Sequence, residues 1–106
     1  MNERRLSRSA NPPDAVALYL ESLCARAELK AVALSTDDGS LVAGAGGLDL
    51  EWMGALGAAS RRAQLEWDGH TLRVDRIEVN SIPFWLTMAD GSAAEAPATI
   101  RRILSQ

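Results

Sequence analysis

The residues of this chain that could carry out chemistry are few, and they lie far apart in the sequence. One cysteine, Cys24, and one histidine, His70, would support nucleophilic catalysis only if the fold brought them into hydrogen-bond contact. Cys24 falls on the apolar stripe of an expected helix, where a thiol is typical of a core residue. His70 follows an Asp68-Gly69 turn, which indicates an exposed side chain. No spacing pairs either residue with a base or a nucleophile, so we predict no catalytic site and no enzyme.

A glycine-rich segment, Gly44-Ala45-Gly46-Gly47, begins like a dinucleotide-binding loop. The third glycine of that pattern would fall at Asp49, and the lysine of a P-loop is absent. The Asp49 carboxylate would also stand where a phosphate has to bind. A single cysteine and a single histidine are too few for a cysteine or histidine metal cluster. We therefore expect a plain connection here, with no cofactor and no metal.

Composition excludes several classes of function. The 106 residues are enough for one small domain, and 47% hydrophobic with 24% charged residues is typical of a globular chain. A net charge of −3 argues against a nucleic-acid-binding protein, because phosphate contacts need a basic face. No apolar run approaches the roughly 18 residues of a membrane span, and no signal-peptide pattern is present. We therefore expect a cytoplasmic protein.

Hydrophobic periodicity divides the chain into a leading segment and one domain. Residues 1–13 carry four charges and show no periodicity, so we predict a flexible arm followed by a single domain over residues 14–106. Helical spacing predicts a first helix from Asp14 to Glu28 and a second, capped by Asp49, that runs to about Arg62 or Ala63. A short last helix is expected to carry Ile100, Ile103 and Leu104 and, because of Pro97, to begin later than Ser92. Alternation and turn residues predict five strands, over residues 31–35, 41–43, 64–67, 70–79 and 82–89.

Two of the expected strands carry apolar residues on both faces. In the strand from His70 to Val79 the apolar positions change phase between Val74 and Ile77, which predicts a β-bulge. In the last strand Phe84 and Leu86 share one face with the other even positions, so that Trp85 and Thr87 point to the other. Both faces of the sheet therefore need cover.

The second helix has two apolar sides. On a helical wheel one side carries Trp52, Met53, Leu56, Ala59 and Ala63, which suits packing on the sheet. The other side carries Leu50, Gly54, Gly57, Ala58 and Arg61. Each glycine inside a helix costs about 1 kcal/mol relative to alanine, so a close-packed neighbour is expected to compensate for it. We predict that this neighbour is another chain, and the alternative is a crossing helix of the same chain.

The order of elements, with particular segments, resembles the roadblock/dynein light-chain family. The matching pieces are the Ala31 to Ala43 hairpin with Asp37-Asp38-Gly39 at its tip, the helix opening with Leu48-Asp49, the strand Ile82 to Ala89, and the ending Ile100-Arg101-Arg102-Ile103-Leu104. The resemblance runs from about Asp14 to Leu104, which is almost the whole chain.

The resemblance implies an α+β fold of the roadblock/profilin-like type, in the order α-β-β-α-β-β-β-α. A five-stranded antiparallel sheet would have two helices on one face and the middle helix on the other. Members of the family typically dimerise through the middle helix and the third strand. For this chain the resemblance implies a homodimer, or a heteromer with another roadblock protein, with an interface made of Leu50, Gly54, Gly57, Ala58, Arg61, Leu65 and Trp67.

Family members are non-catalytic by themselves, and they bind, regulate or scaffold Ras-like small GTPases and their regulators. Bacterial MglB-like proteins act beside a Ras-like GTPase in cell polarity and motility, and MglC-like proteins serve as adaptors. The chain is short after Ala89 and its expected last helix is brief. These departures favour an adaptor or a heteromeric partner.

A small-molecule sensor is the alternative function. Related α/β sandwich domains bind ligands between the sheet and a helix. Such a pocket would be lined by aromatic side chains, with Tyr19 or His70 supplying a polar group. The candidate lining residues are Trp52, Trp67, Phe84 and Trp85.

Overall fold

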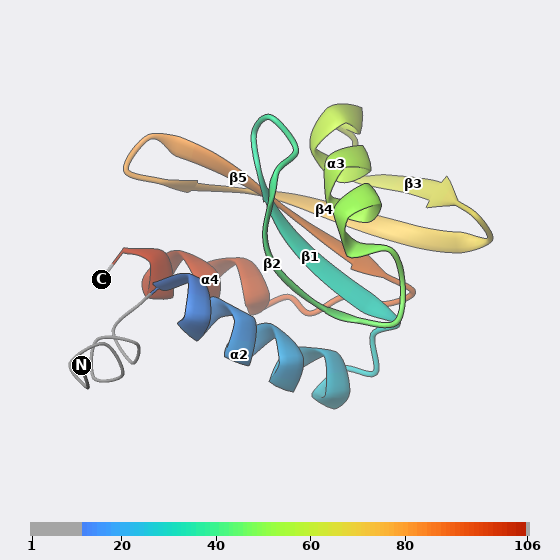
Figure 1. Cartoon of the computed structure of the whole chain (residues 1–106), viewed down its shortest axis with the longest axis horizontal. Coiled ribbons are helices and arrows are strands. Elements are labelled where there is room, and N and C mark those ends of the chain that lie inside the picture. Colours follow the sequence, from blue (N-terminus) through green and yellow to red (C-terminus); the bar gives the residue numbers. More distant parts are fainter. Residues whose placement is uncertain (1–11, 106) are drawn as a thin grey trace, which may run out of the picture.

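The computed structural model describes residues 12–105, with helices and strands labelled as in Figure 1. The helices are α2 (Pro12–Arg26), α3 (Leu50–Ser60) and α4 (Ala96–Leu104). The strands are β1 (Ala31–Thr36), β2 (Leu41–Gly46), β3 (Gln64–Trp67), β4 (His70–Val79) and β5 (Ile82–Ala89). This α+β order confirms the predicted one. Within the described residues, no helix is both long and apolar enough to cross a bilayer.

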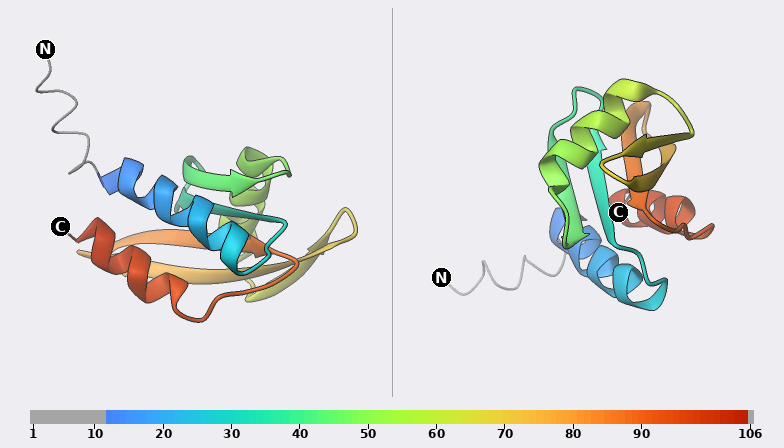
Figure 2. Two further views of the ribbon diagram at one scale, coloured as in Figure 1. Left: turned by 90° about the horizontal axis from the view of Figure 1, so that it is seen from below. Right: turned by 90° about the vertical axis from the view of Figure 1, so that its right-hand side faces the viewer.

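The five strands form one antiparallel sheet in the order β2-β1-β5-β4-β3. Helices α2 and α4 lie side by side on one face, and α3 covers part of the other (Figure 2). On the two-helix face, α2 packs mainly on β2, and α4 packs on β4. The outer edges of the sheet are therefore β2 and β3.

The larger core lies between the sheet and the two helices α2 and α4. Leu20 and Leu23 of α2 and Ile100 of α4 are fully buried there against Leu86 of β5. Leu86 and Met88 share this face with the less buried Phe84, as their alternation predicts. A smaller core lies under α3 and includes Met53 and Leu72.

Strand β4 contains no bulge, and the prediction of one was wrong. Its pairing with β5 runs without interruption from Leu72↔Ala89 to Val79↔Ile82. Leu72 and Val74 pack under α3, whereas Ile77 and Val79 belong to the core under α2 and α4. The apolar side chains of β4 thus switch faces between Val74 and Ile77 because the first half of the strand is covered by α3 and the second half by α2 and α4 on the opposite face.

Several element boundaries also differ from the predictions; helix α2, for example, ends at Arg26 and not at Glu28. Helix α2 begins at Pro12, so Asp14 lies in its first turn rather than at its cap, since prolines fit the first turn of a helix. Residues 1–11 of the predicted arm lie outside the described residues. The glycine-rich segment is not a plain connection, because β2 continues through Gly44 to Gly46. Helix α3 ends at Ser60 because Arg61 adopts a left-handed backbone conformation.

Candidate interaction surface

Helix α3 is the element on which the predicted interface depends, and its N-terminus forms as expected. The carboxylate of Asp49 accepts a hydrogen bond from the Trp52 N–H at 3.1 Å, which is the geometry of an N-cap. The cap fixes the start of the helix and therefore which side chains face the sheet.

The side of α3 that carries the glycines faces the chain's own sheet. Met53, Gly54, Gly57 and Ala58 are buried. A Cβ added at Gly57 would lie 2.0 Å from the Thr87 Oγ1, and one at Gly54 would lie 3.3 Å from the Cβ of Ser35. The Ser35 hydroxyl also donates to the Gly54 carbonyl oxygen at 3.0 Å.

The predicted assignment of the two helix sides was therefore wrong. The glycines let α3 approach β1 and β5 closely, so neither another chain nor a crossing helix is needed to explain them. Leu50 and Ala58 also pack on the smaller cores of this chain rather than on an outer flank. Of the predicted interface residues on this side, Gly54, Gly57 and Ala58 are buried inside the domain.

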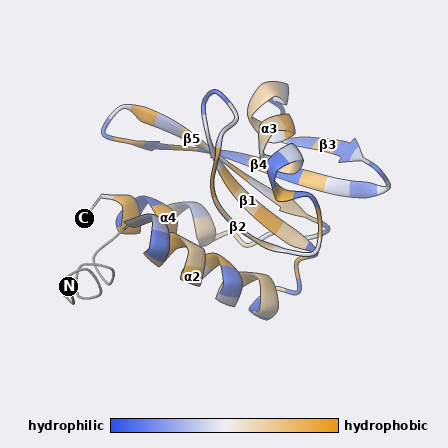
Figure 3. Cartoon of the chain, viewed as in Figure 1, coloured by the Kyte–Doolittle hydropathy of each residue, from blue (hydrophilic) through white to orange (hydrophobic). Residues whose placement is uncertain are grey.

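Of the residues that were expected to face the sheet, Met53 is buried there as predicted, whereas Trp52 and Ala59 lie on the outer side of α3. Trp52 is 55% exposed, one of the few large hydrophobic side chains so exposed among the described residues. Ala59 is exposed, and Leu56 is partly buried on the β3 side of the helix together with Leu65 and Trp67. Apolar colouring extends over much of α3 in Figure 3, whereas α2 alternates between polar and apolar positions.

Beside this helix side lies the free edge of β3. The Val74 N–H donates to the Ala63 carbonyl oxygen at 2.9 Å, and β3 pairs with β4 in register from Gln64↔Arg73 to Trp67↔His70. Hydrogen-bonded pairs alternate along an antiparallel ladder. The backbone N–H and C=O groups of Gln64 and Glu66 therefore point away from β4, toward an edge at which no strand of residues 12–105 is paired.

Arg61 joins a cluster that fastens α3 to the β1–β2 turn. Its guanidinium lies 3.2 Å from the Asp37 carboxylate and 5.1 Å from the centre of the Trp85 ring. The same Asp37 oxygen accepts a hydrogen bond from the Trp85 Nε1 at 2.9 Å. Residues of β5, the β1–β2 turn and the end of α3 thus meet at one carboxylate. Sequence reasoning missed this contact because it links positions 37, 61 and 85.

Cys24 and His70 have separate structural roles. The Cys24 thiol donates to the Leu29 carbonyl oxygen at 3.1 Å, and burial raises its pKa. The Nδ1 of His70 lies 2.6 Å from the Asp90 carboxylate, which also accepts the Thr71 N–H at 3.0 Å. These hydrogen bonds hold the pKa of Asp90 below its usual value. Neither group contacts the other.

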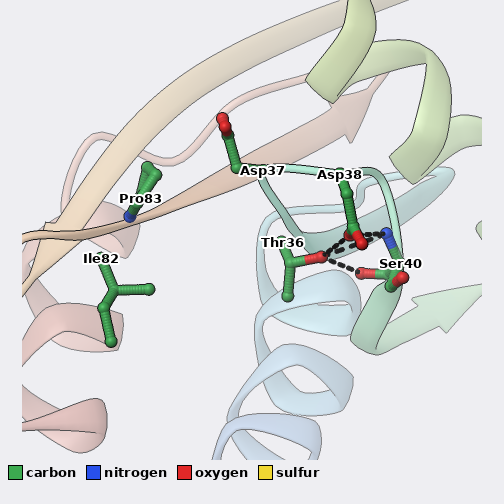
Figure 4. Close-up of a pocket in the computed structure, with 6 residues that line it drawn as sticks. All are labelled: Thr36, Asp37, Asp38, Ser40, Ile82 and Pro83. Carbon is green, nitrogen blue, oxygen red and sulfur yellow. Dashed lines mark hydrogen bonds between the residues drawn. The ribbon is translucent and has the colours of Figure 1, made fainter.

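The hollow drawn in Figure 4 lies between the β1–β2 and β4–β5 turns. The Asp38 carboxylate accepts hydrogen bonds from the Thr36 hydroxyl and, at 3.2 Å, from the Ser40 N–H, and these bonds lower its pKa. One oxygen of the Asp38 carboxylate thus stabilises the turn.

The aromatic residues proposed for a sensor pocket do not converge. Trp85 is buried on the α3 face of the sheet, whereas Phe84 packs against the core on the opposite face. Trp52 is exposed on the outer side of α3. The structure therefore contradicts a single pocket lined by these side chains.

The comparison with known proteins bears on the fold. No family model matches the chain, and no curated protein resembles it closely enough to be a relative. Among solved structures, MglB of Myxococcus xanthus superposes with a TM-score of 0.58 over 85% of this chain and 84% of that one, at 16% identity. The chain has a roadblock-like fold. At this identity the likeness concerns architecture alone.

Proposed function

We propose that this chain is a non-catalytic interaction module that dimerises through the outer side of α3 and the edge of β3. The observation that carries the proposal is the exposed indole of Trp52 on the same side of the domain as a short strand with unpaired backbone groups. Pairing of two β3 edges would satisfy the backbone groups of Gln64 and Glu66 and extend the sheet across two copies. Of the residues expected from sequence, Leu65 and Trp67 keep a place in this interface.

Within the cell we propose that the dimer associates with a Ras-like small GTPase or its regulators, as an adaptor in the cytoplasm. The roadblock-like fold shared with MglB supports this role, because the sequence resemblance implies GTPase-associated partners for such folds. A heteromer with a second roadblock protein would use the same interface. Roles in bacterial cell polarity or motility follow from the same resemblance.

Light scattering on a sizing column tests the dimer. We expect a mass of twice 11.4 kDa that persists on dilution. A mass of one chain at all concentrations would contradict homodimerisation.

Calorimetry tests the GTPase association. The purified chain is titrated with a Ras-like GTPase loaded with GDP, and separately with one loaded with a non-hydrolysable GTP analogue. We expect binding that differs between the two nucleotide states. Equal affinity, or no binding in either state, would contradict a role in GTPase regulation.

A further inference from the structure

The second free edge of the sheet, β2, differs from β3 in its length and in its chemistry. Its six residues, Leu41 to Gly46, include no charged side chain and no proline. Native sheets usually protect a free edge with such residues, because unpaired N–H and C=O groups invite another strand. A bulge interrupts the register with β1 at Val42, so the stretch from Ala43 to Gly46, which has no such interruption, is the candidate for strand addition.

The ladder to β1 fixes which backbone groups of β2 are free. The Gly47 N–H donates to the Lys30 carbonyl oxygen at 3.2 Å, and the register pairs Val32 with Ala45 and Ala33 with Gly44. Because bonded pairs alternate, the N–H and C=O groups of Gly44 and Gly46 point away from β1.

Acidic side chains flank this edge from both layers of the domain. On α2, Arg26 faces α4, where it lies 3.5 Å from Glu95. Because α2 packs on β2, the exposed carboxylates of Glu21 on α2 and of Glu28, two residues after the end of α2, lie in the layer that covers β2. On the other layer, Ala55 of α3 lies against the β1–β2 turn at Gly39, and Glu51 stands one turn before it on the same side.

The charge is unevenly distributed along the chain as well. Residues 12–51 include seven acidic and two basic residues, whereas residues 52–105 include six of each. Among the described residues, Glu21, Glu28, Asp49 and Glu51 have no ion-pair partner within 4.0 Å. The part of the chain that forms α2 and β2 therefore carries a net negative charge, which favours a positively charged partner.

We propose that the outer edge of β2 binds an extended, basic segment of a partner protein as a sixth strand. The backbone groups of Gly44 and Gly46 would supply the main-chain hydrogen bonds, and the flanking carboxylates would select arginine and lysine side chains. This site lies on the opposite edge of the sheet from β3, so it is independent of the proposed dimer.

Amide hydrogen exchange measured by NMR tests the proposal on the full chain. The probe is a synthetic peptide that alternates valine and arginine, and a peptide that alternates valine and glutamate is its control. We expect the basic peptide to slow exchange at Gly44 and Gly46 about tenfold or more, and the acidic peptide to leave both amides unchanged. Unchanged amides with the basic peptide, or equal protection by both peptides, would overturn the proposal.

A pair of matched variants tests the role of charge. Glu21→Gln combined with Glu51→Gln removes two charges beside β2, and we expect it to weaken binding of the basic peptide about tenfold. Asp68→Asn combined with Asp75→Asn makes the same change of net charge in the β3–β4 turn and on β4, and we expect affinity to stay within about twofold. Equal losses in both variants would overturn the site. Slow exchange at Gly44 and Gly46 in the free chain would also overturn it, because the edge would already be covered.

Discussion

The two free edges of the sheet present the same kind of backbone groups in contrasting surroundings. Strand β3 is four residues long, and its apolar side chains Leu65 and Trp67 pack beneath α3, on whose outer side Trp52 is exposed. Strand β2 is six residues long and is covered by α2, which carries exposed carboxylates such as Glu21. The first setting suits a second copy with the same apolar surface, and the second suits an oppositely charged strand. Side chains around an edge, rather than its hydrogen bonds, therefore decide the kind of partner.

The largest expected effect comes from Gly57→Leu, because this glycine allows α3 to pack closely on β5. The first side-chain atom would meet Thr87 Oγ1 at 2.0 Å, so overpacking is expected to cost about 3 kcal/mol or more. We expect loss of the folded domain in urea denaturation, and not the selective loss of dimer that an outward-facing glycine would give. The exposed variant Ala59→Leu is the control and should stay folded. A stably folded Gly57→Leu would contradict the position of α3.

Trp52→Glu is expected to disrupt the proposed dimer interface beside β3 without changing the core. The indole is 55% exposed, so the fold should persist while a charge enters the proposed interface. We expect a tenfold or greater rise in the dimer dissociation constant, about 1.4 kcal/mol or more. The control is Leu18→Glu, since Leu18 is 67% exposed on α2 across the sheet. Equal weakening by both variants in analytical ultracentrifugation would show that the effect is not local.

Asp37→Ala removes the carboxylate that joins the β1–β2 turn to β5 and to the end of α3. It removes the acceptor of the Trp85 Nε1–H bond, so we expect a loss of about 1–2 kcal/mol in unfolding free energy. The exposed pair with Arg61 should add little. Asp37→Asn keeps an acceptor and should lose less than half as much. Urea unfolding of both variants measures these losses of unfolding free energy. Equal losses would show that the charge of Asp37, and not its hydrogen bond to Trp85, stabilises the fold.

The smallest effect concerns Asp90, which ties the end of β5 to β4. Because hydrogen bonds from His70 and Thr71 hold the folded-state pKa of Asp90 below its usual value, the ionised carboxylate stabilises the fold above the unfolded-state pKa of about 3.9. This contribution is lost as pH falls through the folded-state pKa. Asp90→Asn cannot titrate, so the drop in urea midpoint between about pH 6 and about pH 3 should be smaller than in the wild type. An unchanged drop would contradict the role of Asp90.

Sequence patterns were sufficient for the architecture because apolar spacing and turn residues are local signals. The Asp49 cap and the faces of β5 followed from such signals. The orientation of α3 did not, because both of its sides are apolar and only the approach of Thr87 to Gly57 distinguishes them. The shift of the apolar positions in β4 from one face of the strand to the other had two explanations, a β-bulge or packing of the two halves of the strand against helices on opposite faces of the sheet. The uninterrupted pairing with β5 shows that the second is correct. The meeting of Asp37 with Trp85 depends on strand order, which no local pattern encodes.

The most direct measurement compares the masses of Glu66→Pro and Glu66→Ala by light scattering. The Glu66 N–H points away from β4, so proline there removes a donor needed only by a strand from another chain. We predict a dimer for Glu66→Ala and a folded monomer for Glu66→Pro, with circular dichroism confirming that both are folded. A folded Glu66→Pro that remains a dimer would contradict pairing through the edge of β3.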